Sequence, residues 1–160
     1  MDGNKKIATR AVLRRIVDSL RAGHKKIVFT NGCFDLLHLG HVQLFAKAKS
    51  LGDVLVVAVN SDKSLRRLKG PRRPLVGQVD RCKVLAALES VDFVTVFGED
   101  TPEEIIRELM PDVLVKGGDY KISQIVGRQY AGRVVRFPVV KGRSTSALIK
   151  KIVESYAQGR

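Results

Sequence analysis

Residues 54–59 read Val-Leu-Val-Val-Ala-Val and form the longest unbroken apolar run in the 160-residue chain. A run without alternating polar residues is typical of a strand that is buried on both faces of a parallel sheet. Outward from this run, shorter β-branched and aromatic stretches predict further strands, because they are bounded by turn residues. The predicted strands are Ile27–Thr30, Val54–Val59, Phe93–Phe97, Val113–Val115 and Arg133–Pro138.

The segments between these strands mostly have the three- and four-residue apolar spacing of amphipathic helices. Thr101 before Pro102 predicts a helix start, with the hydroxyl as the cap. Residues 63–77 contain a glycine and two prolines within positions 70–74, so we expect a loop there. The predicted helices are Val12–Leu20, Val42–Leu51, Val79–Leu88, Thr101–Leu109 and Ala147–Tyr156, the last capped by Ser144 or Thr145.

Strands that alternate with helices predict an α/β fold, because parallel strands need crossovers that cover both faces of the sheet. We therefore expect a doubly wound, mostly parallel sheet in a single domain. This domain covers residues 1–160, with an N-terminal helix in residues 1–24 and a core in residues 25–156. Ligands of such folds bind beyond the carboxyl ends of the strands. The candidate functional loops are therefore residues 30–41, 60–62, 116–120 and 142–146.

The composition excludes several classes of protein. The longest apolar run has six residues, whereas a membrane-spanning helix needs roughly 18. No apolar segment of a secretory signal follows the charged N-terminus. Cys33 and Cys82 lack CxxC spacing, so they provide neither a zinc site nor a disulfide framework. Free thiols are typical of a reducing compartment, and we expect a cytoplasmic protein.

The charge balance is less ordinary, with 29 Lys and Arg against 16 Asp and Glu and a formal net charge of +13. No acidic residue occurs between Lys63 and Gln78, or between Tyr120 and Val153. Such a surplus favours nucleic acid, an acidic membrane surface or phosphorylated small molecules as partners. A nucleic-acid-binding module is the less favoured alternative, because the chain has six phenylalanines, three tyrosines, no tryptophan and no recognition motif.

His38 and His41 lie at the predicted start of the helix that follows the first strand. Helix positions three apart share a face, so both imidazoles can reach one ligand. Gly40 between them lets a ligand approach the backbone, and the free N–H groups of a helix start attract anions. Two structural, hydrogen-bonded histidines are the alternative, and two histidines without a third ligand make a poor zinc site. The pattern therefore favours phosphate binding.

The stretch from Phe29 to His41 reads Phe-Thr-Asn-Gly-Cys-Phe-Asp-Leu-Leu-His-Leu-Gly-His and resembles the signature of the HxGH nucleotidyltransferase superfamily, the cytidylyltransferase-like group. The residues Arg-Ser-Thr-Ser at 143–146 resemble its second signature, a basic residue before a helix start rich in Ser and Thr. Within this group, the chain most resembles the adenylyltransferase part of ADP-heptose synthase, from about Leu13 to Ile152. Further matching segments are Val59–Asp62, Arg67–Gly70 and Leu114–Tyr120.

The resemblance implies an enzyme that transfers AMP from ATP to a heptose 1-phosphate and releases pyrophosphate. The product is ADP-heptose, which implies a role in lipopolysaccharide core biosynthesis. The implied partners are ATP and a sugar 1-phosphate, with Mg²⁺ carried by the nucleotide phosphates, no protein metal site and no obligate nucleic acid. A homodimer is compatible with the exposed edges of small α/β transferases. Many members carry a preceding sugar kinase domain, for which 160 residues leave no room, so we expect a stand-alone transferase.

The implied reaction is an in-line attack of the sugar phosphate on the α-phosphorus of the nucleotide. This phosphate has its second pKa near ~6, so it is largely ionised at neutral pH and needs no general base. Catalysis then depends on positioning and on stabilising the charge of the phosphoryl oxygens. Carried over from the resemblance, the expected catalytic residues are His38, His41 and Arg143. The expected nucleotide-binding residues are Thr30, Asn31, Gly32, Phe34, Gly40, Lys69, Arg81, Ser144, Thr145 and Ser146. The expected acceptor-binding residues are Asp35, Asn60, Asp62, Lys116, Gly118 and Asp119.

Alternatives to these assignments stay open. The same fold with another acceptor or base, such as a glycerol-3-phosphate cytidylyltransferase, fits the same motifs. Asp35 either contacts the substrate or braces the histidine helix, and Arg81 either binds phosphate or is a surface charge. The basic stretch Lys63–Arg73 is solvated surface, a lid over phosphates or a contact to a larger partner. Cys33 is interpreted as a small buried residue and not as a redox switch.

Overall fold

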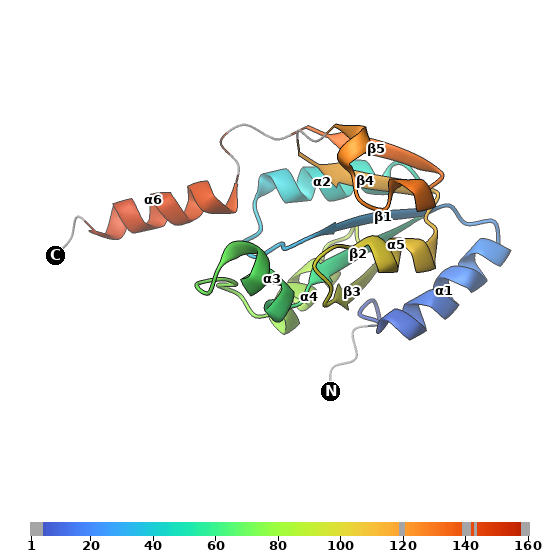
Figure 1. The fold of residues 1–160 in the computed structure, drawn as a ribbon, viewed down its shortest axis with the longest axis horizontal. Coiled ribbons are helices and arrows are strands. Elements are labelled where there is room, and N and C mark those ends of the chain that lie inside the picture. Colours follow the sequence, from blue (N-terminus) through green and yellow to red (C-terminus); the bar gives the residue numbers. More distant parts are fainter. Residues whose placement is uncertain (1–4, 119–120, 139–141, 143, 158–160) are drawn as a thin grey trace.

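A computed structural model describes residues 5–118, 121–138, 142 and 144–157. Its centre is a five-stranded sheet with the strand order β3-β2-β1-β4-β5, in which all neighbouring strands run parallel (Figure 1). This sheet confirms the predicted α/β class. The strands are β1 (Ile27–Gly32), β2 (Val54–Asn60), β3 (Phe93–Phe97), β4 (Val113–Gly117) and β5 (Arg133–Phe137).

Helices cover both faces of this sheet, as the alternating pattern predicts. On one face, α1 (Arg10–Ala22) and α5 (Glu103–Leu109) pack in a core that contains Leu13, Ile106 and Leu114. On the other face, α2 (Leu39–Lys49) and α4 (Gln78–Ala86) pack in a second core around Phe45 and Leu85. Every residue of β2 is buried. Each fully buried Leu, Ile, Val or Phe stabilises the fold by about 1.5–3 kcal/mol.

The prediction of a loop over residues 63–77 is wrong for its first half, which forms α3 (Asp62–Lys69). Ser61 caps this helix, because its hydroxyl accepts a hydrogen bond of 3.1 Å from the backbone N–H three residues later. Leu65 anchors the helix in the core with none of its surface exposed. Gly70 ends it with a φ of 93°, a conformation that favours glycine. One cap and one buried leucine are weak signals in a segment dominated by Lys and Arg.

The predicted helix caps are right at one position and wrong at another. Thr101 does not cap α5, because the N-cap is Pro102 and no side chain caps that end. The carboxylates of Glu103 and Glu104 occupy the first turn instead, where they interact favourably with the positive helix end. Ser144 does cap α6 (Thr145–Ala157), since its hydroxyl accepts a 3.1 Å hydrogen bond from the N–H of Ala147. Figure 1 shows α6 extending away from the sheet, and none of its residues is buried.

The strand order reverses between β1 and β4, which is the point where ligands bind in doubly wound folds. The register pairs Thr30 with Val115, so the next residues, Asn31 and Lys116, meet at the carboxyl edge of the sheet. Two short 3₁₀ helices, Ile122–Gln124 and Arg128–Tyr130, lie between β4 and β5. Among the helices of the described ranges, none is long and apolar enough to cross a membrane.

Candidate active site

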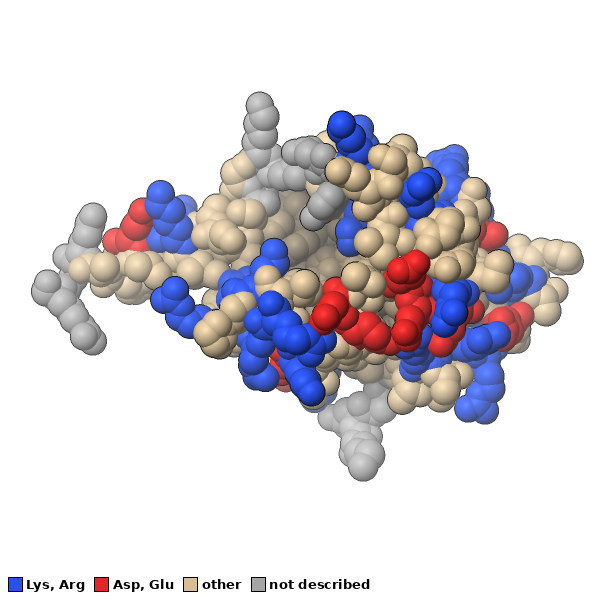
Figure 2. Space-filling model, in the orientation of Figure 1, with Lys and Arg blue, Asp and Glu red and all other residues tan. Residues whose placement is uncertain are grey.

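A cavity of about 1040 Å³ opens at this carboxyl edge. Its wall combines the ends of β1, β2 and β4 with the start of α2, the end of α3 and the first turn of α6. Figure 2 shows this face of the molecule, with Lys and Arg side chains over α3 beside acidic side chains near the start of α5. Small-molecule pockets measure about 300–1,000 Å³. The cavity therefore has room for a nucleotide and a second substrate.

The two histidines of the motif lie together in the cavity wall. His38 is the N-cap residue of α2, and the His38 and His41 rings stack with their centroids 3.8 Å apart. The Phe34 ring meets His41 edge-on at 5.3 Å, and Phe34 itself has a φ of 46°, which is unusual for a bulky residue. A Cβ at position 32 would lie 2.9 Å from the Phe34 ring, so Gly32 permits this packing. The turn after β1 thus packs against the His41 ring, which stacks in turn on the ring of His38.

The environment of His41 keeps its imidazole neutral. Burial, and to a smaller extent the neighbouring His38, lowers the pKa of His41 from 6.5 to about 4. Its Nδ1 is buried and has no hydrogen-bond partner among the residues that the structure describes. A neutral imidazole carries one N–H donor, so it can donate to an oxyanion without abstracting a proton. The N–H groups at the start of α2 add further donors and a positive helix end.

Lys116 and Asn31 form the floor of the cavity where β1 and β4 meet. The Nζ of Lys116 donates a 3.1 Å hydrogen bond to Oδ1 of Asn31. No carboxylate within the described ranges forms an ion pair with Lys116, and burial lowers the pKa of its ammonium group. Cys33 lines the same region with its Sγ 3.8 Å from Oδ1 of Asn60, and burial raises the pKa of its thiol. This floor therefore offers a cation to an anionic ligand and no activated thiolate.

Arg81 lies beneath the cavity and does not line it. Its side chain has no exposed surface, and its guanidinium donates to the carbonyls of Cys33, Asn60 and Val76. It also forms an ion pair of 2.7 Å with Oδ1 of Asp62. The guanidinium thus ties the ends of β1 and β2 to α3 and α4. Arg81 is not a surface charge, and its contacts are those of a buried cross-link.

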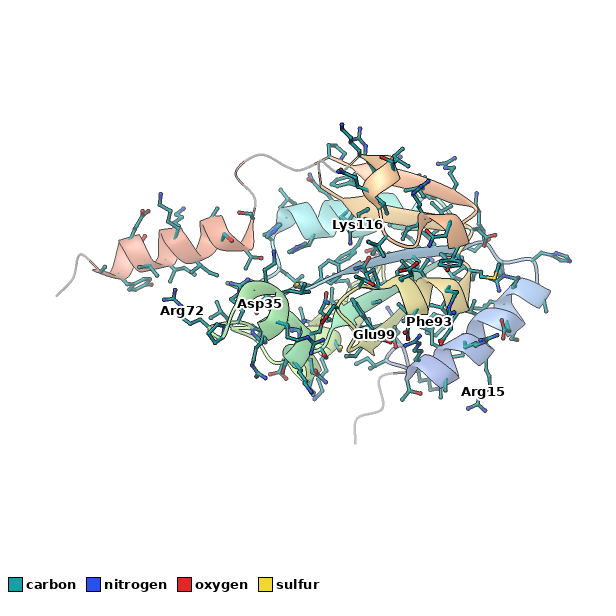
Figure 3. All side chains as sticks on the ribbon, viewed as in Figure 1. Arg15, Asp35, Arg72, Phe93, Glu99 and Lys116 are labelled. Atoms are coloured by element: carbon teal, nitrogen blue, oxygen red, sulfur yellow. The ribbon has the colours of Figure 1, made fainter. Side chains whose placement is uncertain are left out.

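Asp35 also meets protein groups, although it borders the cavity. Its carboxylate pairs with Arg73 at 2.9 Å and accepts hydrogen bonds from the backbone N–H groups of Leu75 and Val76. Lys69, at the end of α3, lines the same wall. Asp35 and Lys116, both labelled in Figure 3, come from the loop after β1 and from β4. The cavity is thus bounded by cations from α3, from the segment that follows it and from β4.

The first turn of α6 closes another side of the cavity. Thr145 and Ser146 line it, and the hydroxyl of Thr145 donates a 3.2 Å hydrogen bond to the carbonyl of Leu36, in the loop before the histidines. Ser144 does not line the cavity, since its hydroxyl caps the helix. Arg143 and Asp119, two of the expected site residues, lie outside the described residues.

Most of the expected site residues come together around this cavity, and a few do not. Thr30, Arg81, Asp62 and Ser144 are described but do not line it. Sequence reasoning gave no individual role to Leu68, Arg72, Arg73 and Asp100, although all four line the cavity. It did leave open a lid over phosphates for the stretch Lys63–Arg73. The acid-free basic run after Lys63 was the available signal for the two arginines. The expected residues that line it are Asn31, Gly32, Phe34, Asp35, His38, Gly40, His41, Asn60, Lys69, Lys116, Gly118, Thr145 and Ser146.

Paired imidazoles at a helix start, in a cavity that cations also line at the switch point of a parallel sheet, are typical of a nucleotidyltransferase. Comparison with known proteins agrees with this class. The family model described as cytidylyltransferase-like matches residues 29–151. The chain belongs to the cytidylyltransferase-like family.

Individual relatives cover nearly the whole chain. It is 51% identical to the bifunctional protein HldE of Geobacter sulfurreducens over 98% of its length and 33% of that protein's. It is 52% identical to HldE of Wolinella succinogenes, over 94% of the chain and 32% of the relative. The chain thus spans about a third of the length of these curated relatives.

One solved structure supports the same family, and another shows the same fold. The lipopolysaccharide core biosynthesis protein of Thermoplasma volcanium is 31% identical, with a TM-score of 0.60 over 71% of this chain and 96% of that one. Pantoate-beta-alanine ligase of Francisella tularensis has a TM-score of 0.63 at 18% identity, over 95% of this chain and 75% of that one. The second likeness shows the fold alone.

Proposed function

We propose that the chain transfers AMP from ATP to a heptose 1-phosphate, giving ADP-heptose and pyrophosphate. The observation that carries this proposal is the pair of stacked imidazoles at the start of α2, which faces a cavity large enough for both substrates. The HldE relatives, about 50% identical over nearly the whole chain, support heptose 1-phosphate as the acceptor and adenine as the base. The lipopolysaccharide core biosynthesis protein among the solved relatives supports the same role.

In the proposed mechanism, an oxygen of the sugar phosphate attacks the α-phosphorus of ATP, and pyrophosphate leaves. The attacking phosphate is ionised at neutral pH, so no side chain needs to remove a proton. His38 and His41 donate hydrogen bonds to the oxygens on which negative charge accumulates. The lowered pKa of His41 supports this role, because a neutral imidazole is a donor that does not protonate the nucleophile. Preorganised donors of this kind are each worth about 10²–10³ in rate.

The remaining residues would bind the two substrates. Asn31, Gly32, Phe34, Gly40 and the hydroxyls of the α6 start, with Thr30 behind them, belong to the nucleotide side of the proposal, together with Lys69 and Arg143. Lys116, Asn60, Gly118 and Asp119 belong to the acceptor side. The contacts of Arg81 with Asp62 and with the carbonyl of Asn60 favour a structural role for both residues. In this role they hold the loops after β1 and β2 in place.

Enzymes of the nucleotidyltransferase class generally use Mg²⁺, which neutralises phosphoryl oxygens when it is bound. The described carboxylates in the cavity wall, Asp35 and Asp100, are both engaged by arginines, at 2.9 Å from Arg73 and 2.6 Å from Arg67. Mg²⁺ keeps several waters and binds readily through substrate phosphates. We therefore propose that the ion is held by the nucleotide phosphates, with few ligands from this chain.

The organisation of the protein completes the proposal. Residues 1–160 would act as a single domain, because Leu13 and Val17 of α1 belong to the same core as β1 and β4. ATP and a sugar phosphate are cytoplasmic metabolites, which supports a cytoplasmic location. Among the described residues, the edge strand β5 leaves one side of the sheet open, which is compatible with a homodimer.

Pyrophosphate release from a matrix of nucleoside triphosphates and sugar phosphates tests the proposal. We expect ATP with a heptose 1-phosphate to be the best pair, and His38→Ala to lower kcat by about 10²–10³ with a much smaller effect on nucleotide binding. If CTP with glycerol 3-phosphate is the better pair, the proposal is wrong and the chain is a glycerol-3-phosphate cytidylyltransferase. Wild-type turnover of the His38→Ala variant would remove the histidines from the mechanism.

A further inference from the structure

The segment Gly70–Val76, here called the strap, joins α3 to α4 and forms part of the cavity wall. Arg72, Arg73 and Leu75 of the strap line the cavity, next to Lys69 at the end of α3. Figure 3 labels Arg72, which projects from the strap on the side of α6. Since the first turn of α6 lines the same cavity, the strap and α6 border one opening.

A single buried carboxylate fixes the strap. The Asp35 side chain is 1% exposed, and its Oδ1 accepts hydrogen bonds of 2.9 Å from the N–H groups of both Leu75 and Val76. Its Oδ2 accepts a second contact from the N–H of Leu75 at 3.0 Å and pairs with Nε of Arg73 at 2.9 Å. A carboxylate has about four lone-pair sites. Three donors of the protein, with the Leu75 N–H shared between both oxygens, therefore engage Asp35, and its burial keeps a sugar hydroxyl away from the carboxylate.

The same contacts separate the cations of the strap into two kinds. The Arg73 guanidinium is neutralised by Asp35 and is largely withdrawn from solvent. Arg72 and Lys69 are exposed and form no ion pair or hydrogen bond with any residue that the structure describes. Both side chains line the same cavity, so an anion bound there would be attracted by both positive charges. The strap and the adjoining end of α3 thus present two uncompensated cations, Arg72 and Lys69, to a cavity of a phosphate-transferring family.

We propose that the strap is a phosphate-binding element, in which Arg72 contacts a phosphate group of a substrate and Asp35 is the positioning residue that holds Arg72 in place. A guanidinium is suited to this contact, because its planar fork binds two phosphate oxygens at once. The phosphate belongs either to the polyphosphate of the nucleotide or to the sugar phosphate. The inference rests on the proposed function only in requiring a phosphorylated substrate, and not on which sugar or base is used.

Isothermal titration calorimetry with inorganic pyrophosphate and, separately, with a sugar 1-phosphate tests the contact of Arg72. We expect Arg72→Ala to raise the Kd of one of these two ligands by about tenfold or more, because charge-assisted hydrogen bonds to phosphate are strong. The ligand affected identifies the source of the phosphate. Arg66→Ala is the matched control, since it removes the same charge from an exposed position of α3 that does not line the cavity. Unchanged binding of both ligands by Arg72→Ala would overturn the proposal.

A double-mutant cycle tests the positioning role of Asp35. Asp35→Asn replaces one acceptor by an NH₂ group that faces the N–H donors of the strap, so we expect it to weaken the same ligand as Arg72→Ala does. Adding Arg72→Ala to Asp35→Asn should then cost little more, because Arg72 is already misplaced. Additive effects would mean that Asp35 and Arg72 act independently, and additivity would refute the positioning role. A urea unfolding curve of Asp35→Asn shows whether the variant is folded, because an unfolded variant would also fail to respond to Arg72→Ala.

If the Asp35→Asn protein does not fold, Arg73→Ala provides a second test of the positioning role. It removes the ion pair and leaves the backbone hydrogen bonds of Asp35 with Leu75 and Val76 in place. We expect a smaller loss of affinity than for Arg72→Ala, with partial rescue by Arg73→Lys. If the substrate matrix fails for heptose while pyrophosphate binding still depends on Arg72, the strap inference stands and the proposed acceptor is wrong.

Discussion

Two cations near the cavity, the buried Arg81 and the partly buried Lys116, are used in opposite ways. On the β2 side, Arg81 is saturated by three backbone carbonyls and the carboxylate of Asp62. On the β4 side, Lys116 donates to Asn31 and has no carboxylate partner within the described ranges. A saturated cation holds the chain together, whereas an unsaturated one is available to an anion. Burial of a charge therefore identifies a binding residue only after its partners have been counted.

Replacing Arg81 by Met should have the largest effect on stability, because it removes the saturated cation. Removing one partner of a buried, hydrogen-bonded ion pair typically costs about 3–5 kcal/mol, and here three carbonyls lose a donor as well. We expect the free energy of unfolding in urea to fall by about this amount. Lys83→Met, at an exposed position of the same helix, should change it by less than about 0.5 kcal/mol. A stable Arg81→Met protein with impaired ATP binding would instead make Arg81 a ligand.

Lys116→Met tests whether the cation without a carboxylate partner binds a substrate. It removes the cation and retains most of the side-chain volume, so we expect the Kd of one phosphorylated substrate to rise by about 10–100-fold. The free energy of unfolding should stay the same or rise, because burial of an ammonium group opposes folding. Calorimetric titration and urea unfolding measure the two effects. Lys47→Met on the exposed side of α2 is the control. A large loss of stability with unchanged affinity would make Lys116 equivalent to Arg81.

Much of the fold was predictable from the sequence, because hydrophobic runs and helical spacing are local. The apolar run of β2 and its neighbours predicted the α/β sheet, and the motif around His38 and His41 predicted the edge that carries the cavity. The contacts of Asp35 were not predictable, since its backbone partners Leu75 and Val76 lie 40 and 41 positions away. The same holds for Arg81 and Cys33, which are 48 positions apart. Residue type alone could not separate cross-links from ligands.

The pH dependence of stability offers a smaller effect, centred on His41. Its pKa is lowered from 6.5 to about 4 in the folded chain, so between these values the unfolded chain binds a proton that the folded chain does not. The free energy of unfolding should therefore fall as the pH drops from 6.5 towards 4, and His41 should add no pH dependence above that window. Comparison of urea unfolding for the wild type and His41→Asn isolates this contribution. An identical pH dependence of both proteins would contradict the neutral imidazole.

The smallest change in the free energy of unfolding is expected in α6, whose side chains pack least against the rest of the chain. Ile152 is 51% exposed, and no residue of this helix is buried. Exposed positions typically change stability by less than about 0.5 kcal/mol, so Ile152→Ala should unfold in urea almost as the wild type does. Ile106→Ala is the matched control on α5, where the same substitution in the core should cost about 2–5 kcal/mol. A loss above about 1 kcal/mol at Ile152 would contradict its exposure, because surface substitutions rarely cost that much. Such a result would mean that α6 is covered in solution, and its dependence on protein concentration would then distinguish a second copy of the chain from contacts within one molecule.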